Sequence, residues 1–436
     1  MRIAFLIAAA IPVAAQEPLS LRDAVRAALQ KHPSAEAAKS DTRAAEARAA
    51  QARAGRLPRA GYTETFQSSN NPVFAFGTLL TQRRFAEKNF AIGSLNDPGF
   101  VNNFQTQVGA DWTIWDAGAN RARESGAVLG VRMSAEQERA SAMRRALETA
   151  RAYQAAVLAA ESAAASKAAV ASAEADLRRA ESVMAVGMST AADVLSIRVH
   201  VAAMKEQAIR RHLDERVARA VLNEAMGAGL EESRLLTTTS RPAATPDADA
   251  PADRPELRQA GIHESMARAA VDEARSALYP RVALRGMFEA DRGRFVTQGG
   301  ANWWLGASLQ WNAFDGGAAR QRVAEARHRV SAATWRKREA EAAVKLEELR
   351  ARASVDAAAE RIAVAAASVT QAEESLRIVK NRYEAGLSPV SDLLRNESAL
   401  LDARLRRLAA LHDQRMAAVQ LEFAKGTLTG DSNVLE

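Results

Sequence analysis

The chain has 436 residues, of which 48% are hydrophobic and 5% aromatic, and it carries a formal net charge of +7. The length allows a large core, and the few aromatics with abundant alanine favour long, closely packed helices over a catalytic α/β domain. The positive charge is spread through segments of mixed sign, which argues against a nucleic-acid partner. The absence of cysteine excludes a disulfide framework and a cysteine-linked lipid anchor.

The amino terminus has the pattern of an export signal. Arg2 precedes an apolar run, and the small residues that end with Ala15 form a cleavage site before Gln16, so we expect a signal peptide over residues 1–15. After it, no apolar run reaches the roughly 18 residues that a membrane-spanning helix needs. A mature protein that enters a membrane must then do so as a closed barrel, because that arrangement also satisfies every backbone polar group in lipid.

The mature chain begins with two predicted helices. Ser20 to Asp23 resembles a capping box and predicts a short helix that ends near His32. A second helix is expected from Ser34 to Ala54, because glycine and proline follow it.

Residues 59–115 predict a β-hairpin with a long connection over 67–103. Its second strand alternates apolar and polar side chains, and one face carries Phe104, Thr106, Val108, Ala110, Trp112 and Ile114. A soluble sandwich is one reading of such a strand. Strands of about nine to eleven residues with aromatics near their ends are more typical of a membrane barrel, because soluble strands average about five or six.

A helical hairpin is expected next, over residues 119–226. It comprises a very long helix from Ala119 to about Met184, a turn around Gly187 and a helix from Ala191 to Met226. Residues 227–253 contain three prolines and many small polar residues, which predicts a linker.

The same order of signals then repeats. The second copy has a β-hairpin over about 281–314, in which Trp303, Leu305, Ala307, Leu309, Trp311 and Ala313 share one face. A helical hairpin follows over 318–426. The chain is thus divided into repeats over 16–226 and 254–426 and a tail over 427–436.

The spacing locates the one difference between the repeats. Trp112 and Trp311 are 199 residues apart, whereas Pro58 and Pro280 are 222 apart, so the first β-hairpin has a net excess of 23 residues. Each repeat contributes two strands. Four strands cannot close a barrel, for which about eight is the lower limit in membranes, so we expect the chain to oligomerise.

These features together resemble the TolC-type outer-membrane efflux proteins over essentially the whole mature chain. The motifs that carry the resemblance are the export signal, the repeat, the junctions Trp115-Asp116-Ala117-Gly118 and Phe314-Asp315-Gly316-Gly317, and the turns Val186-Gly187 and Ala385-Gly386. The resemblance implies a mostly α fold with a small β part. Three copies would form a twelve-stranded outer-membrane β-barrel, surrounded by lipid and continued by a periplasmic α-helical barrel.

The resemblance also implies a function. The trimer would be a passive exit channel in the outer membrane of a Gram-negative bacterium, and it would export small molecules together with an inner-membrane pump and a periplasmic adaptor protein. Protein secretion of type I uses the same tunnel and is an alternative within the family. A periplasmic coiled-coil adaptor or scaffold is an alternative of another class, although it leaves the long amphipathic strands unexplained.

The strand-to-helix junctions have a physical rationale of their own. Asp116 and Asp315 can cap the long helices, and Gly118 and Gly317 permit the sharp turn before each helix. We favour this capping role over any chemistry at these positions.

The turns of the two helical hairpins are the expected site of contact with other proteins. The resemblance places Gly187, Ser189, Gly386 and Ser388 at the periplasmic tip, where we expect the adaptor to dock.

On the same basis, Asp392 is expected to narrow the pore, with Asp193 as its counterpart in the first repeat. Three copies of Asp392 would raise one another's pKa and attract cations. Arg395 replaces a second acidic residue found in some relatives and can pair with Asp392. A simple role at the start of a helix is the alternative for both aspartates.

The long connection over 67–103 contains several phenylalanines around Arg83 and Arg84. We expect it at the outer mouth as a lid or receptor-like surface, and a disordered insertion is the alternative.

The sequence contains no constellation typical of an enzyme. Its six histidines show no metal-binding spacing, and no cysteine can act as a nucleophile. We therefore expect no catalytic residues, no metal site and no cofactor.

Overall fold

The computed structural model describes residues 18–186, 190–232, 234–237, 253–296 and 299–436. The expected signal peptide and most of the expected linker lie outside these ranges. The chain divides into two compact units. The sheet unit comprises Asp41–Ala135 and Gln259–Arg338, and the helical unit comprises the remaining residues. The helices α5 (Ala119–Ala185) and α8 (Ala318–Glu384) contribute to both.

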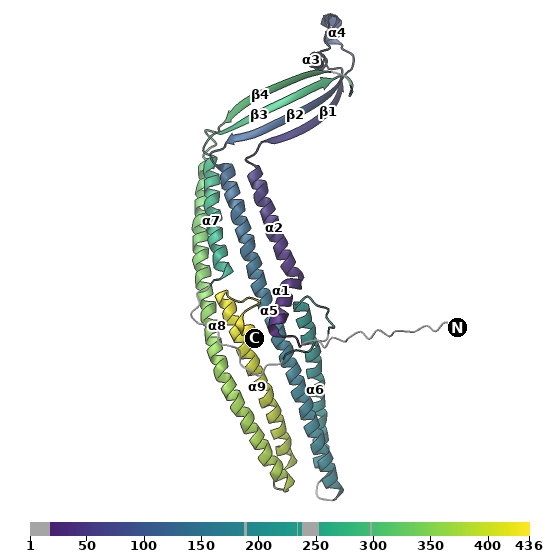
Figure 1. Ribbon diagram of the computed structural model, residues 1–436, viewed down its shortest axis with the longest axis vertical. Helices are drawn as coiled ribbons and strands as arrows, with labels where there is room; N and C mark the ends of the chain where they lie inside the picture. Colours follow the sequence, from purple (N-terminus) through teal and green to yellow (C-terminus); the bar gives the residue numbers. More distant parts are fainter. Residues whose placement is uncertain (1–17, 187–189, 233, 238–252, 297–298) are drawn as a thin grey trace, which may run out of the picture. The chain divides into compact units, whose positions relative to one another are not determined.

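The sheet unit contains a four-stranded antiparallel sheet in the order β1-β2-β3-β4 (Figure 1). The strands are β1 (Arg59–Ser69), β2 (Val101–Trp115), β3 (Arg281–Arg292) and β4 (Gly300–Gln310). The pairing of β2 with β3 joins the two repeats, because each strand comes from a different one. The edge strands β1 and β4 each keep one side without a partner strand in the described chain.

Strand β4 ends earlier than expected. Its last pair joins Gln310 to Arg281, so Trp311 and Ala313 lie beyond the strand and the prediction for these two residues is wrong. Pro280 immediately precedes Arg281. Proline has no backbone N–H with which to extend the ladder, so the pairing stops there.

The register gives the sheet two different faces. One cross-strand row joins Tyr62, Val108, Phe288 and Trp303 on what we call the apolar face. The neighbouring row joins Thr63, Gln107, Glu289 and Asn302 on the polar face. The large side chains of the apolar face are exposed in the single chain; Trp303, for example, is 78% exposed. A contiguous apolar surface of this kind requires lipid or another protein to cover it.

The connection between β1 and β2 is folded, contrary to the alternative of a disordered insertion. It contains α3 (Pro72–Thr81), a 3₁₀ turn (Glu87–Phe90) and α4 (Ile92–Asn96), which lie beyond one end of the sheet (Figure 1). Phe85 makes edge-to-face contacts with Phe76 and Phe90, with ring centroids 4.9 and 5.0 Å apart. Gln82 is buried and donates to the Asn102 carbonyl oxygen at 2.8 Å, which ties the insertion to β2.

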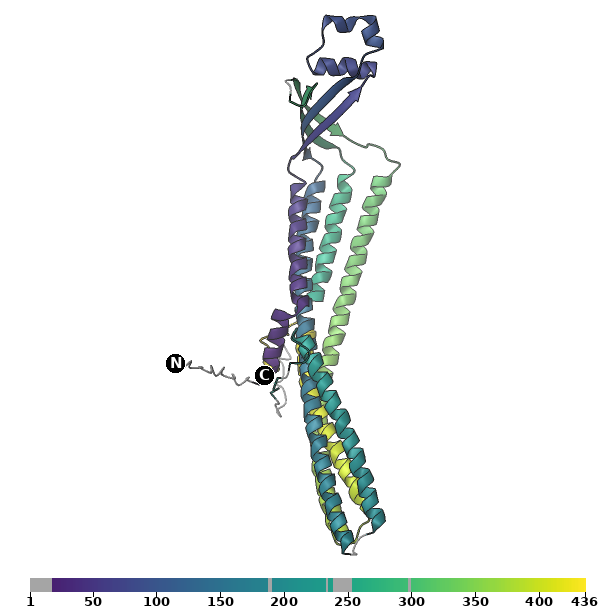
Figure 2. The same ribbon diagram turned by 90° about the vertical axis from the view of Figure 1, so that its right-hand side faces the viewer.

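The helices of the sheet unit lie alongside one another (Figure 2). They are most of α2 (Pro33–Ala54), most of α7 (Pro255–Ser276) and the adjoining parts of α5 and α8. Ion pairs cross between them: Arg123 on α5 lies 2.7 Å from Glu273 on α7, and Lys337 on α8 lies 3.7 Å from Glu264 on α7.

The helical unit contains two antiparallel helix pairs, α5 with α6 (Ala191–Ala225) and α8 with α9 (Val390–Lys425) (Figure 1). The short helix α1 (Leu21–Lys31) begins at the N-cap Ser20, as expected, and packs into the main hydrophobic core with Leu222, Val419 and Leu428. A terminal 3₁₀ turn (Asn433–Leu435) completes this core.

Tyr153 is an almost fully buried member of that core. Its hydroxyl group lies within hydrogen-bond distance of the Leu19 and Thr237 carbonyl oxygens, at 2.8 and 2.9 Å, and burial raises its pKa to about 12. Among the described helices, none has an apolar stretch long enough to cross a membrane. The expected class, mostly α with a small sheet and duplicated halves, is confirmed.

Candidate functional site

The turn between α8 and α9 is closed by backbone hydrogen bonds. Gly386 has a φ of 72°, and the Leu387 N–H donates to the Arg382 carbonyl oxygen at 2.8 Å. The Gly386 N–H donates to the Tyr383 carbonyl oxygen at 3.0 Å. This pattern is a Schellman motif, in which glycine at the left-handed position ends the helix without steric strain.

Asp392 lies in the first turn of α9 and has partners in its own chain. Ser388 Oγ donates to Asp392 Oδ2 at 3.2 Å, and Arg395 Nη1 lies 3.6 Å from Asp392 Oδ1. The Asp392 side chain remains 39% exposed. The structure therefore brings Asp392, Ser388 and Arg395 together, and Arg395 offsets part of the negative charge.

Asp193 occupies the corresponding position at the start of α6. Its backbone N–H donates to Thr190 Oγ1 at 3.1 Å, and the Thr190 backbone N–H donates to Asp193 Oδ2 at 3.4 Å, which forms a capping box. In the described part of the chain no contact joins Asp193 to Asp392. Gly187 and Ser189 lie outside the described residues.

Polar contacts join the two helix pairs above these turns, and the sequence pattern did not point to them. Lys380 Nζ on α8 lies 2.6 Å from Asp176 Oδ1 on α5, and Arg179 Nη1 on α5 lies 2.5 Å from Glu384 Oε1 on α8. The partners are 204 and 205 residues apart in the chain, so no local spacing could have identified them.

A third contact joins α6 to α9. His200 Nε2 lies 3.2 Å from Glu397 Oε2, and both side chains are largely buried. Burial raises the pKa of Glu397 above its ordinary value, and the neighbouring Asp176 carboxyl acts in the same direction, whereas His200 lowers it. We call His200, Glu397, Asp176 and Lys380 the polar cluster, because they come from four helices and lie close together.

The strand-to-helix junctions are held by their aspartates. Asp116 accepts hydrogen bonds from the Gly118 and Asn120 backbone N–H groups at 3.0 and 2.8 Å. Asp315 accepts one from the Ala319 N–H at 2.8 Å. Gly118 and Gly317 both have a φ of 89°, so the chain turns into each long helix through the left-handed region.

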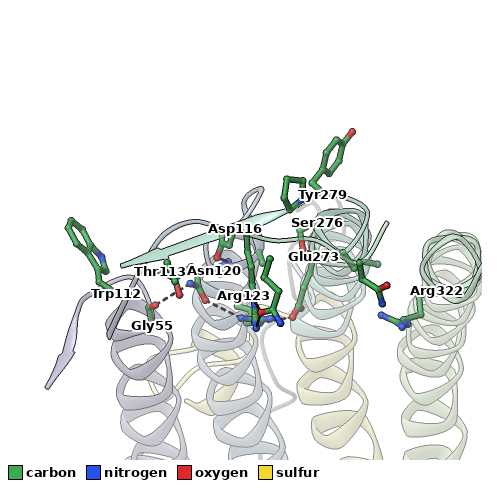
Figure 3. A pocket seen from close by; sticks show the side chains of 18 of the residues that line it. Gly55, Trp112, Thr113, Asp116, Asn120, Arg123, Glu273, Ser276, Tyr279 and Arg322 are labelled. Carbon is green, nitrogen blue, oxygen red and sulfur yellow. Dashed lines mark hydrogen bonds and ion pairs between the residues drawn. The ribbon is translucent and has the colours of Figure 1, made fainter. Parts of the chain in front are cut away.

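A polar pocket of about 1170 Å³, which we call the junction pocket, lies where the polar face of the sheet meets the helix ends of the same unit (Figure 3). Figure 3 shows Arg123 beside Asn120 and Glu273, with Arg322 on the next helix and Trp112 at one side. Asn120 Nδ2 donates to the Gly55 carbonyl oxygen at 3.1 Å, and Arg123 Nη1 donates to Asn120 Oδ1 at 3.0 Å. The pocket was not expected from the sequence, because its lining comes from both repeats.

Among the described residues, no group of three His, Asp or Glu side chains is placed to hold a metal ion. Charged and polar side chains line the junction pocket and lie at the turns. Such surfaces suit the binding or passage of polar solutes.

Comparison with known proteins agrees with this architecture. The chain resembles the outer membrane protein VceC from Vibrio cholerae, with 21% identity, a TM-score of 0.77 and coverage of 93% of this chain and 96% of that chain. It also resembles a membrane protein from Pseudomonas aeruginosa, with 20% identity, a TM-score of 0.79 and coverage of 97% of this chain and 99% of that chain. It resembles the Campylobacter jejuni CmeC outer membrane channel as well, with 16% identity, a TM-score of 0.79 and coverage of 100% of this chain and 95% of that chain.

These structures share the fold of this chain at low sequence identity. No curated relative matches the sequence. A model of the outer membrane efflux protein family matches residues 24–228 and 248–427, which is most of the chain. The chain therefore belongs to the outer membrane efflux protein family and is an outer-membrane protein.

Proposed function

We propose that this chain is the exit channel of a tripartite efflux system and that three copies form a passive conduit for small molecules. The observation that carries the proposal is a four-stranded sheet with two edge strands open for pairing and one largely apolar face. Such a sheet is incomplete as a membrane structure, because its edges and its apolar face both need partners.

The strand count supports a trimer. Four strands are too few for a membrane barrel, and a closed barrel of about eight strands has an interior that side chains fill. Pairing β1 of one copy with β4 of the next in three copies gives twelve strands and leaves a passage. The apolar face would then contact outer-membrane lipid, and the polar face would line the passage.

The helix pairs support a periplasmic continuation of the passage. Both α6 and α9 carry charged and apolar positions that alternate at helical spacing, and α6 leaves Val199 and Ile209 about 71% exposed. Exposed apolar side chains on a long helix need neighbours, and two more copies of the chain supply them. In this arrangement the helices form a barrel in the periplasm of a Gram-negative bacterium.

The turns support contact with other components. Leu387 is exposed beside Gly386 and Ser388 at the α8–α9 turn, which suits docking of a periplasmic adaptor protein that connects the channel to an inner-membrane pump. The turn with Gly187 and Ser189 belongs to the same proposed surface. Three copies of Asp392 would narrow the passage at this end, with Asp193 on the neighbouring turn, and Arg395 would moderate the charge of the ring.

Membrane fractionation followed by mass determination in detergent tests this proposal. We expect outer-membrane protein with about three times the mass of the mature chain. A soluble periplasmic monomer would contradict the channel and favour the adaptor or scaffold alternative. Outer-membrane protein of another stoichiometry would contradict the trimer alone.

A further inference from the structure

The junction pocket contains more positive than negative side chains. Six arginines line it, namely Arg59, Arg123, Arg281, Arg285, Arg322 and Arg329. Four carboxylates line it, namely Asp111, Asp116, Glu273 and Glu325. The lining includes no lysine and no histidine, so its charge does not depend on a group that titrates near neutral pH.

The carboxylates already have partners. Asp111 Oδ1 lies 2.5 Å from Arg285 Nε, and Glu273 Oε1 lies 2.7 Å from Arg123 Nε. Glu325 Oε1 lies 2.5 Å from Arg329 Nη2. Asp116 accepts the backbone N–H groups of the α5 start. None of these carboxylates forms an ion pair with Arg59, Arg281 or Arg322, and six arginines against four carboxylates leave the lining with an excess of positive charge.

Two arginines of the sheet therefore keep their charge available. Arg281 donates to Gln310 Oε1, a neutral acceptor, at 2.8 Å from its Nε. Arg59 stands opposite Asp111 in the strand register, but Asp111 is bound to Arg285. Within the described residues neither Arg59 nor Arg281 has a carboxylate partner, and both side chains are exposed.

The other two acidic residues of the polar face, Asp291 and Glu289, lie farther along the sheet and accept hydrogen bonds from side-chain amides. Asp291 is only 1% exposed and accepts from Asn103 Nδ2 at 2.5 Å and Gln105 Nε2 at 3.3 Å. Glu289 accepts from Gln107 Nε2 at 3.1 Å. The charge that the polar face presents to solvent at the junction is therefore positive.

We infer that this pocket, repeated in each copy, forms a basic collar around the passage and that the conduit favours small anionic solutes such as carboxylates, sulfonates and phosphates. The inference rests on the proposed function. Guanidinium groups bind planar oxyanions through two parallel hydrogen bonds, and rings of arginine select anions in pores. Arg59 and Arg281 supply the excess charge, because the other four arginines are paired or lie near Asp315.

Ion selectivity of the purified protein in planar bilayers tests the collar. Under a KCl gradient we expect a zero-current potential with the sign of chloride preference. The double variant R59Q/R281Q should lower the chloride-to-potassium permeability ratio at least about twofold, because two positive charges per copy are lost. The backbone ladder between β3 and β4 does not depend on the Arg281 side chain, so we expect the pairing to be retained.

The matched control is R121Q/R320Q, which removes two exposed arginines of the same helix starts that do not line the pocket. It should keep the wild-type ratio. Cation preference in the wild type, or equal ratios in all three proteins, would overturn the inference. Absence of any conductance step would instead count against the proposed channel.

Binding of an anionic fluorophore, 8-hydroxypyrene-1,3,6-trisulfonate, to the detergent-solubilised protein provides a readout that needs no current. We expect the wild type and R121Q/R320Q to bind it equally, and R59Q/R281Q to bind it several-fold more weakly. Equal binding by R59Q/R281Q and the wild type would overturn the collar even if the protein conducts.

Discussion

His200 Nε2 on α6 lies 3.2 Å from Glu397 Oε2 on α9, and each side chain is only 10% exposed. Asp176 on α5 and Lys380 on α8 complete the polar cluster, with 2.6 Å between them. Two helix pairs from different repeats are thus joined by polar side chains, of which Lys380 is partly exposed and the other three are largely buried. Such groups are costly to desolvate and are strongly destabilising when one partner is removed, so the cluster makes the stability of this region sensitive to protonation.

Glu397→Gln should flatten the dependence of stability on pH. The pKa of Glu397 is raised in the folded chain, chiefly by burial, so the folded state holds this proton more tightly than the unfolded state. Its contribution to stability is fully present below the unfolded pKa and is lost as the pH rises through the raised value. We expect the thermal midpoint of the variant to exceed that of the wild type above the raised pKa.

Thermal unfolding between about pH 4 and about pH 8 measures this difference. Glu374→Gln is the control, because its carboxylate is exposed and bound to Arg377. Parallel curves for wild type and Glu397→Gln would show that Glu397 does not cause the pH dependence.

Ala117→Gly should raise the thermal midpoint. Ala117 has a φ of 53° at the first strand-to-helix junction, where an L-residue costs about 1–2 kcal/mol and glycine does not. At the corresponding place in the second repeat Gly316 has a φ of 69° and open space around it. The reciprocal change Gly316→Ala should lower the midpoint, and two shifts of the same sign would contradict the strain argument.

Tyr153→Phe should destabilise the helical unit by about 1–2 kcal/mol. The change leaves the buried carbonyl oxygens of Leu19 and Thr237 without their hydroxyl donor. Tyr279→Phe is the control, because Tyr279 is exposed. Chemical unfolding followed by circular dichroism measures the effect, and equal stability of both variants would exclude Tyr153 as the tie between these segments.

Arg395→Gln should shift the permeability ratio of the channel toward cations about twofold, because it removes the partner of Asp392. Asp392→Asn should change the ratio in the opposite direction. Reversal potentials in bilayers measure both, with Arg210→Gln on α6 as the control. If neither variant moves the ratio, Asp392 does not line the narrow part of the passage and acts only at the helix start.

Phe85→Ala should loosen the insertion without affecting the rest of the chain. Phe85 contacts both Phe76 and Phe90, so its removal takes away the centre of a small aromatic cluster. Limited proteolysis should then cut within residues 72–100 faster than in Val73→Ala, which alters an exposed side chain. If efflux also changes, the insertion acts as the hypothesised lid, and unaltered efflux despite loosening would argue against that role.

Local signals explain how much of the fold could be predicted. Helix starts and ends depend on caps and periodicity within a few residues, so α5 was expected to begin at Ala119 and does. Alternation along β2 identified its two faces for the same reason. The insertion was harder, because α3 and α4 are short and are held by Phe85 and Gln82, and their own propensity gives little signal.

The sequence by itself determined the repeat, the order of the elements outside the insertion and the caps at Asp116 and Asp315, since each depends on neighbouring residues. Only the tertiary structure decided which distant side chains meet. The row of Asp111 with Arg285, the pair of Lys380 with Asp176 and the arginine-rich pocket all join the two repeats. Residues about 200 positions apart have no fixed spacing, so their contacts depend on strand register and helix packing.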